Sequence, residues 1–261
     1  MNEGGLLYTF SRVVYFIGMK IISRLEKYII RIEKRKFLVG HSTLSARYNT
    51  REENRRLWNN YDWTQCGEEW TQSAKTLKGL DPNLWKTAVI NNMMLKYIMG
   101  NPVVLEIGPG GGRWTEVLHP ICHRLLVADI SEKCLSICKE RFKAYSNIEY
   151  YLIEDGLLGF VSDDSVDYIW SYDVFVHINP VDTERYMIEF DRILKPGGYA
   201  IIHHADVYSS EEDAKNGFRS SMDGKLFAYL VEKHGMRLVE QNNSLPHKHG
   251  DLISVFRKPV Q

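Results

Sequence analysis

The sequence contains few of the features that place a chain in a specialised class at first sight. Its 261 residues include four cysteines, which form neither a CxxC pair nor a disulfide framework. Such cysteine usage is typical of a reducing compartment. Arg12 and Lys20 interrupt the N-terminal apolar residues, so no uncharged run there approaches the roughly 18 residues of a membrane span, and no small-residue cleavage site follows. We therefore expect a cytoplasmic protein.

An excess of positive or negative charge is also lacking. The chain has 33 Lys and Arg against 33 Asp and Glu, so it has no general basic excess of the kind that binds nucleic acid. A metal site is not expected either. His119, Cys122 and His123 lie close together, but their spacing matches no common zinc pattern and Pro120 interrupts it.

The first 40 residues form a distinct segment with eight Lys and Arg against three Glu. Within residues 6–32, apolar side chains recur at three- and four-residue steps, which predicts an amphipathic basic helix. Two interpretations stay open. The apolar face packs on the protein itself or on a second copy in a homo-oligomer, or the helix lies peripherally on the anionic inner face of a membrane.

Residues 41–84 are polar yet rich in aromatic side chains. Thr50 and Glu53 have the spacing of a capping box, which predicts a helix over residues 51–60, and Asp81-Pro82 predicts the start of another. We expect most of the aromatic side chains to pack between helices and one or two to cover a ligand site. This segment therefore predicts a helical, aromatic-rich cap.

From residue 85 onward, short apolar segments alternate with helical ones, which favours a parallel sheet covered on both faces. The last two apolar segments have no helix between them, so we expect them to pair antiparallel. The expected strands cover residues 103–107, 124–129, 148–153, 166–171, 199–204, 236–241 and 251–257. The prediction is one α/β domain over residues 85–261, with a mostly parallel sheet that ends in an antiparallel hairpin.

The first strand leads into a glycine-rich turn, Glu106-Ile107-Gly108-Pro109-Gly110-Gly111-Gly112. Glycines allow unusual backbone angles and let a ligand approach the main chain closely. The dinucleotide fingerprint GxGxxG fails here, because its third glycine would fall on Arg113 or on Thr115. An NAD-dependent oxidoreductase is therefore disfavoured.

With these motifs in this order, residues 85–258 resemble the class I S-adenosylmethionine-dependent methyltransferases, which implies a Rossmann-like seven-stranded sheet and S-adenosylmethionine as cofactor. The resemblance implies that the glycine turn meets the methionine end of the cofactor. Asp129, 21 residues after Gly108, would bind the ribose, and Asp155 would accept a hydrogen bond from the adenine amino group. The cofactor-binding residues implied are Glu106, Gly108, Pro109, Gly110, Gly112, Asp129, Ile130, Asp155, Gly156 and Ser171.

The chemistry of a sulfonium methyl donor requires alignment of the acceptor and, for a hydroxyl acceptor, removal of a proton. Three histidines are candidates for that base: His203, His204 and His177. Because side chains alternate along a strand, we expect only one of His203 and His204 to reach the site. Asp173 and Arg219 are candidates for acceptor binding.

The sequence favours O-methylation of a small molecule or a saccharide. Ser171-Tyr172-Asp173-Val174 stands where methyltransferases acting on the amino groups of bases carry an Asn/Asp-Pro-Pro-Tyr/Phe motif, so N-methylation is less favoured. The aromatic-rich segment of residues 41–84 and a membrane-surface helix would suit glycan biosynthesis, since envelope glycans are often assembled on lipid carriers. N-methylation of a small molecule and a cofactor-binding module without turnover stay open as alternatives.

Overall fold

A computed structural model describes residues 49–71, 75–76, 79–154, 156–206, 219–246 and 250–260. All of these residues belong to one compact unit, Arg47–Gln261. The basic helix predicted over residues 6–32 lies outside the described residues, as does Asp155.

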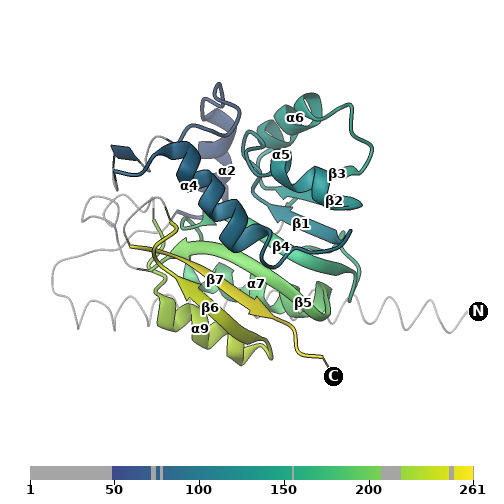
Figure 1. The fold of residues 1–261 in the computed structure, drawn as a ribbon, viewed down its shortest axis with the longest axis vertical. Coiled ribbons are helices and arrows are strands. Elements are labelled where there is room, and N and C mark those ends of the chain that lie inside the picture. Colours follow the sequence, from purple (N-terminus) through teal and green to yellow (C-terminus); the bar gives the residue numbers. More distant parts are fainter. Residues whose placement is uncertain are drawn as a thin grey trace, which may run out of the picture. The chain divides into compact units, whose positions relative to one another are not determined.

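Seven strands form one sheet in the order β3-β2-β1-β4-β5-β7-β6 (Figure 1). All neighbouring pairs are parallel except β5 with β7 and β7 with β6. This confirms the predicted mostly parallel sheet with an antiparallel C-terminal hairpin. The strands are β1 (Val103–Ile107), β2 (Arg124–Asp129), β3 (Ile148–Leu152), β4 (Val166–Phe175), β5 (Leu194–Ala205), β6 (Arg237–Asn242) and β7 (Asp251–Arg257).

Helices cover both faces of the sheet, because side chains alternate along each strand. Val104 of β1 belongs to one buried cluster, whereas its neighbour Leu105 belongs to the other. The first cluster packs against α4 (Pro82–Val89), the π-helical turn η1 (Ile90–Met94), α5 (Thr115–Leu118) and α6 (Glu132–Arg141). The second packs against α7 (Pro180–Ile193) and α9 (Gly224–Lys233). A short 3₁₀ turn, η2 (His119–Ile121), follows α5.

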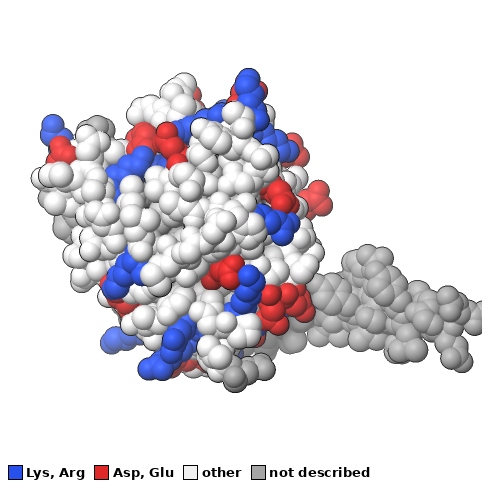
Figure 2. Space-filling model, turned by 45° about the vertical axis from the view of Figure 1, so that its right-hand side comes forward, with Lys and Arg blue, Asp and Glu red and all other residues white. Residues whose placement is uncertain are grey.

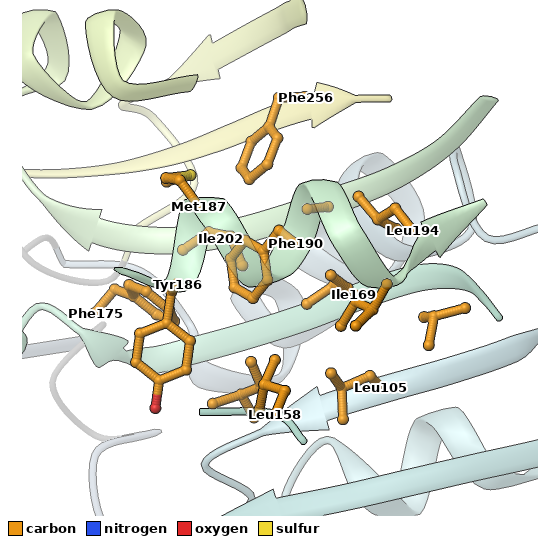
Figure 3. Close-up of a cluster of buried hydrophobic side chains, with 14 of the residues drawn as sticks. Leu105, Leu158, Ile169, Phe175, Tyr186, Met187, Phe190, Leu194, Ile202 and Phe256 are labelled. Atoms are coloured by element: carbon orange, nitrogen blue, oxygen red, sulfur yellow. The ribbon is translucent and has the colours of Figure 1, made fainter. Parts of the chain in front are cut away.

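The larger cluster is shown in Figure 3, where Met187 and Phe190 of α7 lie over Ile169 and Ile202 of the sheet. Phe256 of β7 reaches the same cluster, so the antiparallel hairpin shares the core of the parallel strands. Full burial of a side chain of this size stabilises a fold by about 1.5–3 kcal/mol. The core therefore stabilises the central strands of the sheet.

The capping box predicted at Thr50 is present and begins α2 (Arg51–Asn60): Glu53 N–H donates to the Thr50 hydroxyl, and Thr50 N–H donates to the Glu53 carboxylate. Asp81 caps α4 as predicted. The structure differs from the prediction in β4, which extends past Ser171 to Phe175 through a register shift relative to β5. That irregular stretch contains Asp173.

Within the described ranges, no helix is long and apolar enough to cross a membrane. On the face shown in Figure 2, Lys and Arg side chains are interspersed with Asp and Glu rather than gathered by sign. That face therefore offers no basic surface for a nucleic acid backbone.

Candidate active site

A cavity opens at the carboxyl ends of the central strands, where open α/β sheets bind ligands. Its floor is formed by the loops that follow β1, β2 and β4, and its roof by residues 54–70. The residues that line it include Asn54, Trp58, Trp63, Gly67, Trp70, Gly108, Pro109, Gly110, Arg113, Asp129, Ile130, Asp173, Val174, His177, Tyr186 and Arg219.

The glycine loop after β1 needs its glycines for conformation and for space. Gly108 has a φ of +72° and Gly110 a φ of +56°, in the region that L side chains rarely adopt. A Cβ atom on Gly108 would lie 2.2 Å from Cγ2 of Val174, and one on Gly110 would lie 2.7 Å from the Trp63 ring. The loop is therefore in close contact with the loop after β4 and with the roof.

Glu106 and Gly112 do not line the cavity, although the resemblance assigned both to cofactor binding. Glu106 is buried beneath the loop and accepts a hydrogen bond from Thr115 Oγ1 at 2.6 Å. Burial raises the pKa of Glu106 to about 8. A Cβ atom on Gly112 would meet the Phe142 ring at 2.6 Å. In this structure both residues contribute to the support of the loop.

Asp129 ends β2 and lines the cavity together with Ile130. Its Oδ1 accepts a hydrogen bond from the Ser131 N–H at 2.8 Å. Its side chain is buried, which raises the pKa of Asp129 to about 7. A carboxylate in this position can accept hydrogen bonds from a pair of hydroxyl groups.

Helix α2 is fixed across the ends of β2 and β3. Arg55 donates to three backbone carbonyls: Nε to Ile130 O at 3.1 Å, Nη2 to Ile153 O at 3.1 Å and Nη2 to Glu154 O at 2.9 Å. Gly156 lies beneath the same helix, because a Cβ atom there would be 2.5 Å from Cζ of Arg51. Gly156 therefore contacts the roof rather than the cavity.

Four aromatic side chains, Trp58, Tyr61, Trp63 and Trp70, form a cluster that we call the aromatic cap. Their ring centroids are 5.0–6.0 Å apart. Three of the four, all except Tyr61, also line the cavity. Three rings rather than the expected one or two therefore line the cavity, and the four rings pack against each other rather than between helices.

A row of ionisable side chains runs from the cavity into the sheet; we call it the charge chain. Arg113 Nη1 is 3.3 Å from Asp173 Oδ2, and Asp173 Oδ1 is 3.2 Å from His203 Nδ1. His203 Nε2 is 3.5 Å from Asp251 Oδ2, and Asp251 pairs with Arg219. Arg113, Asp173 and Arg219 line the cavity, so the charge chain starts and ends there.

The three candidate histidines occupy different places. His204 faces α9: it stacks on Phe227 at 3.8 Å, and its Nε2 lies 2.7 Å from Ser254 Oγ. Burial lowers the pKa of His204 to about 3. His203 is on the opposite face, as alternation predicts, but it lies behind Asp173 and accepts a hydrogen bond from the Asp173 N–H at 3.1 Å. Of the three, only His177 lines the cavity.

A catalytic role for His204 is therefore corrected to a structural one, because its ring is enclosed between β7 and α9. Ser171 also lies away from the cavity; its Oγ donates to Ile107 O at 2.9 Å and joins β4 to β1.

A family model described as a methyltransferase domain matches residues 105–202, from β1 into β5. This match, with the seven-stranded fold, supports assignment of the chain to the class I S-adenosylmethionine-dependent methyltransferases. The chain is 32% identical over 114 residues to the squalestatin hexaketide synthase clz14 of Cochliobolus lunatus and 30% identical over 118 residues to that of a Phoma species. These matches cover 39% of this chain and 4% of each synthase.

Solved structures share the fold of this chain. The PH0226 protein of Pyrococcus horikoshii aligns with a TM-score of 0.55 at 21% identity, over 69% of this chain and 92% of that one. The CurJ carbon methyltransferase aligns with a TM-score of 0.56 at 16% identity, over 76% and 58%. The [4+2]-cyclase SpnF aligns with a TM-score of 0.52 at 15% identity, over 78% and 84%.

The cofactor of the methyltransferase is S-adenosylmethionine, and the cavity has groups that fit it. The loop offers main chain without Cβ atoms at Gly108 and Gly110, and Asp129 offers carboxylate oxygens. Arg113 has a buried Nη2 atom without a hydrogen-bond partner among the described residues. Within those residues no cluster of three or more His, Cys, Asp or Glu side chains could hold a metal ion.

Sequence reasoning missed two members of the charge chain, Arg113 and Asp251. Arg113 directly follows the glycine run and entered only as evidence against a dinucleotide site, although an arginine at such a turn is itself a signal for an anion. Asp251 begins a strand that carries no motif, so only the pairing of β5 with β7 brings it to His203.

Proposed function

We propose that this methyltransferase methylates a hydroxyl group of a small molecule or a saccharide held under the aromatic cap. The observation that carries the proposal is the roof: α2 and the aromatic cap cover the ends of the strands, so the acceptor enters a lined cavity rather than an open groove. Aromatic walls with a few charged groups are typical of small-molecule sites. The C–H surfaces of a saccharide would pack against the aromatic rings, and its hydroxyl groups would form hydrogen bonds with the charged groups.

Bound S-adenosylmethionine supplies a methyl group on a positively charged sulfur, which is already electrophilic. The protein then has to hold the donor, align the acceptor and exclude water. We assign Asp129 to the ribose hydroxyls, Ile130 to the adenine and the main chain at Gly108 and Gly110 to the methionine end. Asp155, proposed for the adenine amino group, lies outside the described residues.

His177 is our candidate for the base. It is the one predicted histidine that lines the cavity, and its ring lies 5.2 Å from Trp58 of the aromatic cap. Asn54 of α2 donates to His177 O at 3.3 Å, which fixes the loop beneath the roof. Asp173 and Arg219, also in the lining, are the proposed contacts to the acceptor.

The experiment is transfer of a labelled methyl group from S-adenosylmethionine to fractions of a cell extract, followed by isolation of the labelled product. With the acceptor in hand, His177→Ala should lower kcat by 10²–10⁴, the usual effect of removing a general base. His204→Ala is the matched control, because His204 faces α9. A near-wild-type rate for His177→Ala would exclude the base role, and labelling of no acceptor would favour a binding module without turnover.

Carbon methylation is the second candidate, favoured by the structural similarity to a carbon methyltransferase and by the partial match to polyketide-type synthases named above. It also needs a base near the methyl group. N-methylation is the third. A ¹³C-labelled methyl group identifies the atom to which it is bound by its chemical shift, so the spectrum of the product separates these reactions.

For residues 6–32, we propose contact with either an anionic membrane on its cytoplasmic side or a second copy of the chain. Deletion of residues 1–36 should reduce co-sedimentation with anionic vesicles in the first case and the oligomeric mass in the second. The deletion should leave cofactor affinity intact in both, because the described lining of the cavity comes from residues 54–219. A link to glycan biosynthesis depends on the acceptor that the labelling experiment identifies.

A further inference from the structure

Asp173 has a backbone conformation that nearby groups must hold. Its φ is +64°, in the left-handed region where a residue with a Cβ atom persists only when its surroundings impose it. It lies between Ser171 and Phe175, where the register of β4 shifts relative to β5, and it is not among the paired positions of β4 with β1 or β5. The regular ladder of the sheet therefore does not fix this residue, although it lines the cavity.

His203 of β5 supplies a contact to this backbone. Its Nδ1 accepts a hydrogen bond from the Asp173 N–H at 3.1 Å. A ring nitrogen accepts only when it carries no hydrogen, so a neutral ring in this arrangement carries its proton on Nε2. The other tautomer would point Nδ1–H at the Asp173 carboxylate, whose Oδ1 is 3.2 Å away, and would remove this acceptor from the Asp173 N–H. The ring is buried and stacks on Tyr172 at 4.2 Å, which fixes its plane.

Asp251 favours the tautomer that holds Asp173. It begins β7, its side chain is buried, and its Oδ2 is 3.5 Å from His203 Nε2. A carboxylate can only accept hydrogen bonds, so it favours a proton on the nitrogen that faces it. The other oxygen, Oδ1, pairs with Arg219, which lines the cavity. One buried carboxylate thus contacts a cavity arginine on one side and the ring behind Asp173 on the other.

The charges of the charge chain balance when this ring is neutral. Arg113 pairs with Asp173, and Arg219 pairs with Asp251. Each carboxylate beside His203 therefore already has an arginine as its partner. A charged ring would add a third positive group to this buried row, and burial of a charge without its own partner is costly.

We propose that Asp251 and His203 are positioning residues for the methyl acceptor. Asp251 holds the His203 ring in its Nε2–H tautomer, the ring holds the Asp173 backbone, and Asp251 also orients Arg219. One buried pair thereby places both charged groups of the acceptor half. The inference rests on the proposed assignment of Asp173 and Arg219 to the acceptor, whereas the tautomer can be measured without an acceptor.

The test is nuclear magnetic resonance of the full chain with ¹⁵N-labelled histidine rings, because long-range ¹H–¹⁵N spectra distinguish protonated from unprotonated ring nitrogens. The wild type should show His203 protonated at Nε2, its signals being those that His203→Asn removes. Asp251→Asn should move the proton to Nδ1, because the asparagine oxygen stays on Arg219 and its amide group then donates to Nε2. Hydrogen exchange of the Asp173 amide should become about tenfold faster, the loss of roughly one hydrogen bond.

Asp206→Asn is the matched control. Asp206 directly follows β5, and its Oδ1 accepts a hydrogen bond from the Gly224 N–H at 2.7 Å, which the asparagine oxygen keeps. This variant should change neither the His203 tautomer nor the exchange of the Asp173 amide. A proton on Nδ1 in the wild type, or an unchanged tautomer in Asp251→Asn, would overturn the proposal.

A second pair of variants decides if Asp251→Asn does not fold in a thermal unfolding scan. In His203→Asn the side-chain oxygen can take the place of Nδ1 and accept from the Asp173 N–H, whereas His203→Leu removes the acceptor. Slower exchange of the Asp173 amide in His203→Asn than in His203→Leu would support the role of the ring. Equal exchange in the two variants would overturn it.

Kinetics distinguish this proposal from the proposed function. With an identified acceptor, Asp251→Asn should raise the KM of the acceptor about tenfold, while calorimetry should show an unchanged affinity for S-adenosylhomocysteine. Parallel losses for both ligands would indicate a purely structural role and overturn the proposal. Failure to find any acceptor would refute the proposed methyl transfer, while the tautomer would still decide whether Asp251 and His203 hold Asp173.

Discussion

The cavity has two halves that are built in different ways. The half proposed for the donor consists of the glycine loop and the end of β2, residues 108–110 and 129–130, and depends on main-chain geometry. The half proposed for the acceptor contains Asp173, His177 and Arg219, whose positions depend on contacts between distant segments. Backbone geometry follows from short sequence motifs, whereas pairing of distant side chains follows only from the tertiary fold.

The two halves also differ in charge. In the donor half, burial raises the pKa of Asp129 to about 7, and beneath the loop it raises the pKa of Glu106 to about 8. In the acceptor half, Asp173 and Asp251 each pair with an arginine. Binding to the donor half should therefore depend on pH near neutrality. Binding to the acceptor half should be sensitive to the removal of a single charged side chain.

The strongest test of the donor half is Gly108→Ala. The new Cβ would be 2.2 Å from Val174 and φ is +72°, so the loop must move. We expect at least a hundredfold loss of S-adenosylhomocysteine affinity by calorimetry. Gly100→Ala is the matched control, because Gly100 has a φ of +79° but nothing within 4 Å of a new Cβ. An affinity for Gly108→Ala within threefold of wild type would contradict the role of the loop.

The next effect concerns Asp129. Because burial raises its pKa to about 7, the residue gains its full accepting capacity only above that pH. Affinity for S-adenosylhomocysteine should rise from pH 6 to pH 8 in the wild type. Asp129→Asn should bind about tenfold more weakly at pH 8, the loss of roughly one charge-assisted hydrogen bond, and should lose the pH dependence that Asp129 causes. An unchanged slope in the variant would assign the titration to another group.

A smaller effect is expected at the roof over the donor half. Arg55→Met removes the three hydrogen bonds to carbonyls at the ends of β2 and β3, so α2 should hold less firmly. We expect a loss of affinity of about three- to tenfold, since a net hydrogen bond to a charged group contributes roughly 1.5–3 kcal/mol and water replaces part of it. Arg56→Met, on the exposed side of α2, should leave the affinity unchanged. Equal losses of affinity in the two variants would show that the hydrogen bonds of Arg55 have no specific role in binding.

The smallest effect on ligand binding is expected for Glu106→Gln, which should instead change the pH dependence of stability. The pKa of Glu106 is raised in the folded protein to about 8 from an ordinary value of 4.5. The folded state therefore holds a proton that the unfolded state has released, and stability falls as pH rises from about 4.5 to 8. Denaturant titrations at pH 5 and pH 8 should show a smaller loss in Glu106→Gln than in the wild type. A loss of equal size would place the titration elsewhere.

The difference between the halves explains what the sequence could predict. The glycine turn, the spacing from Gly108 to Asp129 and the capping box at Thr50 are local signals, and the structure contains each of them. The ends of α2 could be predicted, but its position over Ile130 could not, because that depends on Arg55 reaching carbonyls about 75–100 residues away.

The histidine pair shows the same limit. Alternation along β5 predicted that His203 and His204 face opposite sides, which the structure confirms. It could not predict that His203 is separated from the cavity by Asp173, because that depends on the irregular end of β4. His177 follows that strand, and its place in the lining is likewise a property of the folded loop.

The most direct test of the central claim is calorimetry of the full chain with S-adenosylhomocysteine and, in parallel, with NAD. We predict saturable binding of S-adenosylhomocysteine at a single site that Gly108→Ala abolishes, and no binding of NAD. Binding of NAD without binding of S-adenosylhomocysteine would contradict this prediction.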